Sequence, residues 1–222
     1  MWLMSLSRFK RDETTQHMDI VFILLIAATT WWLLCQRYQR SHIALLGRHL
    51  ANLQLERHME TLTQGYARAI HEESESRQLH VLEMFSQTER AVAAQLQSLA
   101  DSMKKETAQD AAIGAGQFCI PYAERFLPSM VRDFRELLNV HAAGMRHVVD
   151  NEGGWEPKDR AYHLSAELYL FQHSCHWFCK SRGVADARLM LRHQVTQQKV
   201  LESVSARTRS AYLKWLEGRS GR

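Results

Sequence analysis

Hydrophobic and polar positions divide the chain into an apolar run near its start and a series of helix-period stripes. Residues 20–35 carry no charge, and only Thr29 and Thr30 in that run are polar. At 1.5 Å per helical residue the run measures about 24 Å, slightly less than the roughly 30 Å hydrocarbon core of a bilayer. Flanking residues extend the run. The pattern therefore predicts a transmembrane helix over residues 18–38, after a short N-terminal tail over residues 1–17.

The residues at the end of this run are typical of a membrane–water interface. Trp31 and Trp32 have rings that favour the headgroup level, and Arg37 and Arg40 follow as basic anchors. A cleaved signal peptide requires small residues after its apolar run, and a lipoprotein signal requires one before its cysteine. Here bulky, basic residues follow, and Cys35 comes directly after a leucine. We therefore expect an uncleaved span rather than a processed leader or a buried core helix.

Apolar residues at alternating spacings of three and four continue from residue 43 to residue 103, with no proline before Pro121. The polar stretch HEESESRQ, residues 71–78, interrupts this stripe and predicts a hinge or an exposed helical turn. The stripe predicts a long, coiled-coil-like helical stalk over residues 39–112. It can be buried in a homo-oligomer or by folding back on other helices. A slip in register after Leu53, and Glu89 within the seam, weaken a continuous coiled coil.

The second half of the chain has the pattern of a helical bundle over residues 117–222. Amphipathic stripes cover residues 131–148 and 164–178, and a third covers 201–215 on a long, basic last helix. GAG at 114–116 with Pro121 marks one helix end and the next start, and NEGGWEPKDR at 151–160 is the strongest loop signal. The expected fold class is all-α: a single N-terminal transmembrane helix, a long heptad-patterned stalk helix and a distal helical bundle.

Charge is distributed unevenly along the chain. The net charge is +4, and residues 182–222 contain nine Lys or Arg against three Asp or Glu, so this segment is +6 and the rest −2. A basic helix of this kind is typical of a solvated surface, and it can also bind nucleic acid or lipid headgroups. Only Tyr212 and Trp215 supply aromatic rings there, too few for typical single-strand binding. We do not expect nucleic acid as a partner, and keep a membrane-tethered nucleic-acid or lipid-headgroup binder as the alternative function.

Candidate metal ligands gather in HSCHWFC, residues 173–179. Cys175 and Cys179 are i, i+4 neighbours on a helix, and His176 lies beside them. Zinc prefers thiolate and imidazole ligands, but a structural site usually needs a second short-spaced pair, and the sequence has none. We therefore expect no metal and no other cofactor, and interpret both cysteines as small core residues. A metal or redox sensor built on these three residues is a further alternative.

Motifs of catalysis and nucleotide binding are missing from the sequence. No GxGxxG, GxxxxGK[ST], GxSxG or HExxH pattern occurs. We therefore expect a protein that is not an enzyme and that acts by binding a protein partner. Trp155 and Glu156 on the Gly-rich loop are the candidate contact residues, because exposed Trp is common at interfaces. The alternative for Trp155 is that its ring packs back on the bundle.

The opening MSLSRFKRDETT, residues 4–15, resembles the start of entry-exclusion proteins of I-type conjugative plasmids, as do the single span and overall size. The resemblance implies a protein of the recipient's inner membrane. Such a protein blocks redundant conjugative DNA transfer by recognising a membrane component of the donor's transfer machinery. The resemblance assigns no residue a role, and it implies that specificity lies in the distal helical domain.

The orientation of the span follows from weaker signals. Three basic residues precede the span and three follow it, namely Arg8, Lys10 and Arg11 before it and Arg37, Arg40 and Arg48 after it. The positive-inside rule therefore gives no decision. The three distal cysteines do not form the dense framework of a small secreted domain. We expect a single-pass protein of a bacterial inner membrane with the bulk of the chain in the cytoplasm.

Overall fold

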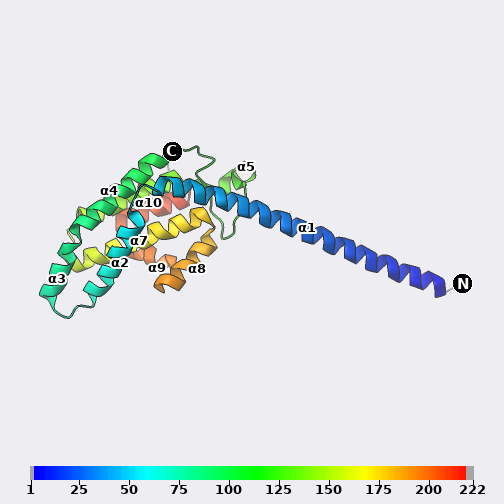
Figure 1. The fold of residues 1–222 in the computed structure, drawn as a ribbon, viewed down its shortest axis with the longest axis horizontal. Coiled ribbons are helices and arrows are strands. Elements are labelled where there is room, and N and C mark those ends of the chain that lie inside the picture. The colour runs from blue at the N-terminus through cyan, green and yellow to red at the C-terminus, as the bar shows by residue number, and fades with distance from the viewer. Residues whose placement is uncertain (1–2, 219–222) are drawn as a thin grey trace.

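The computed structural model describes residues 3–218, and their side chains from residue 18 onward. Its first helix, α1 (Leu3–Leu50), extends away from the other helices over its N-terminal part and packs on them near its end (Figure 1). The mostly helical class and the long apolar helix near the N-terminus are confirmed. Residues 3–17 continue the same helix, so the expected separate tail is part of α1, with residues 1 and 2 outside the described range.

The remaining helices form a bundle around one central helix. They are α2 (Leu55–Ile70), α3 (Glu75–Met84), α4 (Ser86–Met103), α6 (Phe134–Val149), α7 (Pro157–Cys179), α8 (Arg182–His193), α9 (Gln197–Ser203) and α10 (Ala206–Leu216). The central helix is α7, which has 23 residues and contacts α1, α2, α3, α6, α8 and α9. Because α7 is surrounded in this way, apolar positions on several of its faces are buried.

The expected stalk over residues 39–112 is absent from the part of the chain that the structure describes. Instead, α1 ends at Leu50, α2 packs on α7, and α4 packs on α6. The stripe positions Leu62, Leu96 and Leu99 are fully buried by other helices of the same chain. Other helices of the same chain therefore cover these positions of the stripe. The predicted break in HEESESRQ does occur, since α2 ends at Ile70 and α3 begins at Glu75.

The region expected to hold only a helix end and a new helix start contains a small sheet. Strand β1 (Ala112–Gly114) pairs antiparallel with β2 (Val131–Asp133), and the short helices α5 (Ala123–Phe126) and η1 (Pro128–Met130) lie between them. Each strand has only three residues, too few to give an alternating pattern. A tertiary contact holds β1, because Trp177 Nε1 donates to the backbone oxygen of Gly114 at 2.8 Å.

The expected long last helix is divided into α8, α9 and α10. Gln194, which ends α8, has a left-handed backbone with φ of 53°. Thr196 and Ser205 then begin the next helices, each accepting a hydrogen bond from a backbone N–H three residues later. Such hydroxyl caps fix a helix start. The breaks contain neither proline nor glycine, which is why the sequence pattern reads as continuous.

Candidate functional site

The apolar part of α1 is exposed along its whole length. Met18–Leu50 is long and apolar enough to cross a membrane, and its most apolar 18-residue window has a mean hydropathy of 2.1 with no residue buried. The predicted interface residues lie where this part ends. Trp31 and Trp32 are 51% and 60% exposed, and Arg37 and Arg40 are also exposed. All four side chains are thus exposed beside the end of the apolar part, and their contact with a membrane interface stays a prediction.

Past the junction, α1 is fixed to the bundle by polar contacts. His42 is buried, and its Nδ1 lies 2.8 Å from the backbone oxygen of Phe178 in α7. One residue before the end of α1, His49 Nε2 lies 2.8 Å from Glu106 Oε1, and its Nδ1 lies 3.0 Å from Ser102 Oγ. The end of α1 is therefore a structural helix of the bundle, and the exposed part continues it without a break.

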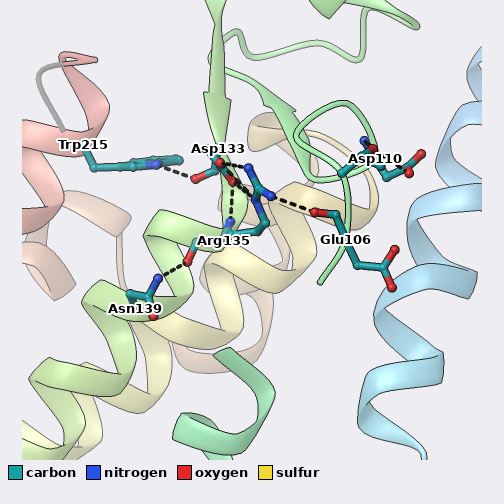
Figure 2. Close-up of polar contacts among 7 residues, drawn as sticks. Glu106, Asp110, Asp133, Arg135, Asn139 and Trp215 are labelled. Carbon is teal, nitrogen blue, oxygen red and sulfur yellow. Dashed lines mark hydrogen bonds and ion pairs between the residues drawn. The ribbon is translucent and has the colours of Figure 1, made fainter. Parts of the chain in front are cut away.

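A polar cluster fixes the place where the sheet, α6 and α10 meet (Figure 2). The Asp133 carboxylate accepts from the backbone N–H of Arg135 at 2.8 Å and pairs with its guanidinium at 2.6 Å. That guanidinium also donates to the backbone oxygen of Glu106 at 2.7 Å, as Figure 2 shows. Trp215 Nε1 donates to the backbone oxygen of Asp133 at 2.8 Å. The cluster ties α10 and the segment after α4 to the start of α6.

The candidate metal residues Cys175, His176 and Cys179 line a hollow of about 230 Å³ between the end of α1, α2, α7 and α8. Burial raises the pKa of the Cys175 thiol well above its usual value and that of Cys179 to about 11. Burial, helped by the nearby Arg188 guanidinium, lowers the pKa of His176 to about 4. Both thiols are therefore protonated at neutral pH.

The surroundings of Cys175, His176 and Cys179 are those of packing residues. Among the described residues, no three His, Cys, Asp or Glu side chains are grouped so that they could hold a metal ion. Cys175 and Cys179 pack against the hydrophobic core. The geometry therefore matches the interpretation of both cysteines as small core residues that also line the hollow.

The candidate contact residues Trp155 and Glu156 lie in the loop between α6 and α7. The side chain of Asn151 braces this loop, accepting from the backbone N–H of Trp155 at 2.9 Å and donating to its oxygen at 3.1 Å. The Trp155 ring is half-buried, with centroid distances of 5.4 Å to His147 and 4.6 Å to His163. Glu156 is exposed and makes no capping hydrogen bond. Trp155 thus packs back on the bundle, and Glu156 is the freer contact residue of the two.

The aromatic side chains of the basic segment point into the core. Tyr212 and Trp215 are both fully buried on α10, and Trp215 Nε1 is used in the cluster of Figure 2. Neither ring is able to stack on a base. The basic side chains Arg188, Arg192, Lys199 and Arg209 are exposed, as expected for a solvated surface. The geometry gives no support to a nucleic-acid interface on this segment.

A buried charge pair holds three helices together. Glu89 on α4 is 2% exposed, and its Oε2 lies 2.6 Å from Arg160 Nη1 on α7. Tyr66 on α2 donates its hydroxyl to Glu89 Oε1 at 2.5 Å. The sequence indicated a buried charge at this position, since Glu89 interrupts the apolar stripe. The partner was not predictable, because Arg160 is 71 residues away.

A second buried carboxyl lies between α7 and α10. Burial raises the pKa of Glu167 to about 7, although hydrogen bonds from Thr208 and Ser205 act in the opposite direction. Gly144 on α6 leaves room for this cluster, because a Cβ there would lie 2.1 Å from Thr208 Oγ1. Two further buried polar contacts lie along α7, where Ser174 Oγ is 2.9 Å from His141 and His173 is 2.8 Å from Asp186. Because Glu167, His141 and Ser174 are buried and hydrogen-bonded to other side chains of the bundle, we assign these contacts to folding.

The sequence matches no protein-family model, and neither a curated protein nor a solved structure is similar to it at a significant level.

Proposed function

We propose that this chain is a single-pass protein of a bacterial inner membrane that presents its helical domain to a protein partner and catalyses no reaction. The observation that carries the proposal is the continuity of α1. One unbroken helix holds an exposed apolar segment and then enters the hydrophobic core through Leu45 and Leu46. An anchor joined in this way holds the domain at a fixed distance from the bilayer, which suits recognition of another membrane protein.

The proposal places the helical domain in the cytoplasm. Support comes from the cysteines, because all four are free thiols, as is usual in a reducing compartment. The test is a pair of C-terminal fusions in intact cells, one to a fluorescent protein that matures in the cytoplasm and one to a phosphatase active only in the periplasm. We expect fluorescence and no phosphatase activity. The reverse result would put the domain in the periplasm and contradict this orientation.

Within this role we propose plasmid entry exclusion, in which the domain recognises a transfer component of the donor cell. The layout of one anchor and one helical domain supports it, together with the resemblance of residues 4–15. The test is a mating assay with recipients that carry or lack the gene and donors that carry an I-type plasmid. We expect fewer transconjugants in recipients with the gene. As a control, transfer of a plasmid with an unrelated transfer system should be unchanged.

The same assay tests the partner-contact residues. Glu156→Lys reverses an exposed charge without removing a capping hydrogen bond, so we expect it to fold and to weaken exclusion. Glu83→Lys, at an exposed position of α3, is the matched control and should exclude normally. Equal transfer into recipients with and without the wild-type gene, with the protein present in the membrane, would contradict the exclusion role. Normal exclusion by Glu156→Lys would contradict only this contact.

A further inference from the structure

Apolar side chains are exposed between β1 and β2, in a segment that the helix-period patterns did not single out. Phe118 and Phe126 are 85% and 78% exposed. Ile120, Leu127 and Met130 are exposed at 37–42%. Five large apolar side chains exposed within 13 residues indicate a contact with a partner or a membrane. The position of this segment in the fold favours a membrane over a protein partner.

The segment lies beside the end of the apolar run of α1. Cys35, the first half-buried residue after that exposed run, has its Sγ 3.7 Å from the backbone oxygen of Cys119. The ring of Tyr38 lies 5.5 Å from that of Tyr122, at the start of α5. Figure 1 shows α5 next to α1 on the side of the bundle that faces the free part of the helix. The segment therefore lies where α1 enters the bundle.

The length of the exposed run sets the level of the bilayer surface. Residues 18–34 cover about 25 Å at 1.5 Å per residue, less than the roughly 30 Å hydrocarbon core. The headgroup layer beyond that core adds roughly 5–7 Å on each side. A bilayer centred on the run thus brings its headgroups to the level of Cys35 and Tyr38, and so to the neighbouring residues 118–126.

The charges at this level suit a lipid surface. Arg37 and Arg40 on α1 and Arg125 on α5 are all exposed. Cationic side chains at this depth attract anionic headgroups, while aromatic rings beside them favour the interface. A membrane surface explains why the exposed apolar side chains and the exposed basic side chains both lie where the apolar run of α1 ends. A protein partner would not explain this position.

We propose that residues 118–130 form a second membrane contact, with Phe118 and Phe126 inserted into the interface of the bilayer that α1 spans. This contact rests on the proposed anchoring by α1. Two points of attachment, the helix and the segment, would fix the tilt of the bundle and stop it rotating about α1. The partner-facing surface is then held in one orientation relative to the membrane.

The test is site-specific photocrosslinking of the full-length protein in native membranes. A photoreactive p-benzoylphenylalanine replaces Phe118 or Phe126 in separate variants, which keeps an aromatic side chain at each position. The same residue replaces Leu191, 84% exposed on α8, as a matched exposed control outside residues 118–130. It also replaces Leu25, 56% exposed in the apolar run, as a control for the span. After irradiation, mass spectrometry distinguishes phospholipid adducts from protein adducts.

We expect phospholipid adducts at Phe118, Phe126 and Leu25, and none above background at Leu191. Lipid adducts at Leu25 but only protein adducts, or no adducts, at both phenylalanines would overturn the second contact and leave the anchor intact. Absence of lipid adducts at Leu25 would overturn the anchor and the second contact together. Lipid adducts at Leu191 equal to those at the phenylalanines would show that exposure alone gives the signal, which also overturns the inference.

Discussion

The imidazole of His42 lies nearly parallel to the ring of Phe178, with the centroids 4.4 Å apart and the planes 8° from each other. Phe178 in turn stacks on Phe134 of α6 at 4.1 Å. A side chain of α1 thus continues a stack of rings that reaches into the core. The same His42 ring also forms a hydrogen bond with the backbone of α7, so His42 joins α1 to the bundle by two contacts.

We expect His42→Ala to destabilise the protein by about 2 kcal/mol, because it removes both the stacked ring and a buried hydrogen bond. His42→Phe keeps the ring and loses only the hydrogen bond, so we expect a loss of about 1 kcal/mol. Thermal unfolding in detergent, followed by far-UV circular dichroism, measures both. Each kcal/mol corresponds to roughly 2–4 °C in Tm for a chain of this size. Equal stability of His42→Ala and wild type would show that the stack does not hold α1.

The sequence predicted which faces of the helices are buried better than it predicted what covers them. Leu62 and Leu96 were assigned to an apolar stripe, and both are fully buried. Helical periodicity identifies such a face, but it contains no information on whether a second copy or the same chain covers it. Here α6 and α7 cover it, through contacts between residues far apart in the sequence. The expected stalk was wrong for this reason.

In the buried pair of Glu89 and Arg160, we expect the effect of each substitution on stability to depend on whether the other residue is present. Arg160→Met leaves the Glu89 carboxylate buried without its cation, so we expect a loss of about 3–5 kcal/mol. The double variant Glu89→Leu with Arg160→Met removes both charges and should recover most of that loss. Denaturant unfolding of the two single variants and the double variant measures the coupling.

The exposed pair of Arg207 and Glu152 is the control for this cycle. Its side chains are 58% and 50% exposed, with the charged atoms 3.1 Å apart. Exposed pairs contribute little, so we expect Arg207→Met to change stability by less than about 1 kcal/mol. If Arg160→Met were equally mild, the pair would not hold α4 to α7.

The surroundings of some candidate residues could be predicted from the sequence, and those of others could not. The position of Trp31 and Arg37 beside the end of the exposed apolar run was predictable, and their depth in a bilayer stays a prediction. Trp155 was predicted only as one of two alternatives, since the side on which a loop ring packs depends on His147 and His163 from two different helices. Phe118 and Phe126 follow no helical period, so their exposure is visible only in the fold.

Two glycines in helices allow the effect of close packing to be compared with the intrinsic preference of alanine over glycine in a helix. A Cβ at Gly144 would lie 2.1 Å from Thr208 Oγ1 and 3.0 Å from Glu167 Oε2, so we expect Gly144→Ala to destabilise by about 1–3 kcal/mol. A Cβ at Gly47 would meet no atom within 4 Å, so Gly47→Ala should stabilise by about 0.5–1 kcal/mol. The two Tm shifts should therefore have opposite signs. A gain in both variants would mean that α6 and α10 are less closely packed than this structure shows.

The raised pKa of Glu167 predicts a pH-dependent stability. Burial raises this pKa to about 7, from the ordinary 4.5 that applies when the chain is unfolded. The folded protein therefore keeps a proton that the unfolded chain releases. The stability from this group is complete below pH 4.5 and is lost as pH rises to about 7, by a total on the order of 3 kcal/mol.

Glu167→Gln removes this titration while keeping an oxygen that can accept from Ser205. We therefore expect the variant to match wild type near pH 5 and to be more stable near pH 8. Buried histidines act in the opposite direction, since the pKa of His141 is lowered to about 3 and its stabilising effect is lost as pH falls below about 6.5. That contribution is common to both proteins, so the difference in Tm between them isolates Glu167. A difference that stays constant from pH 5 to pH 8 would show that this carboxyl does not titrate in that range.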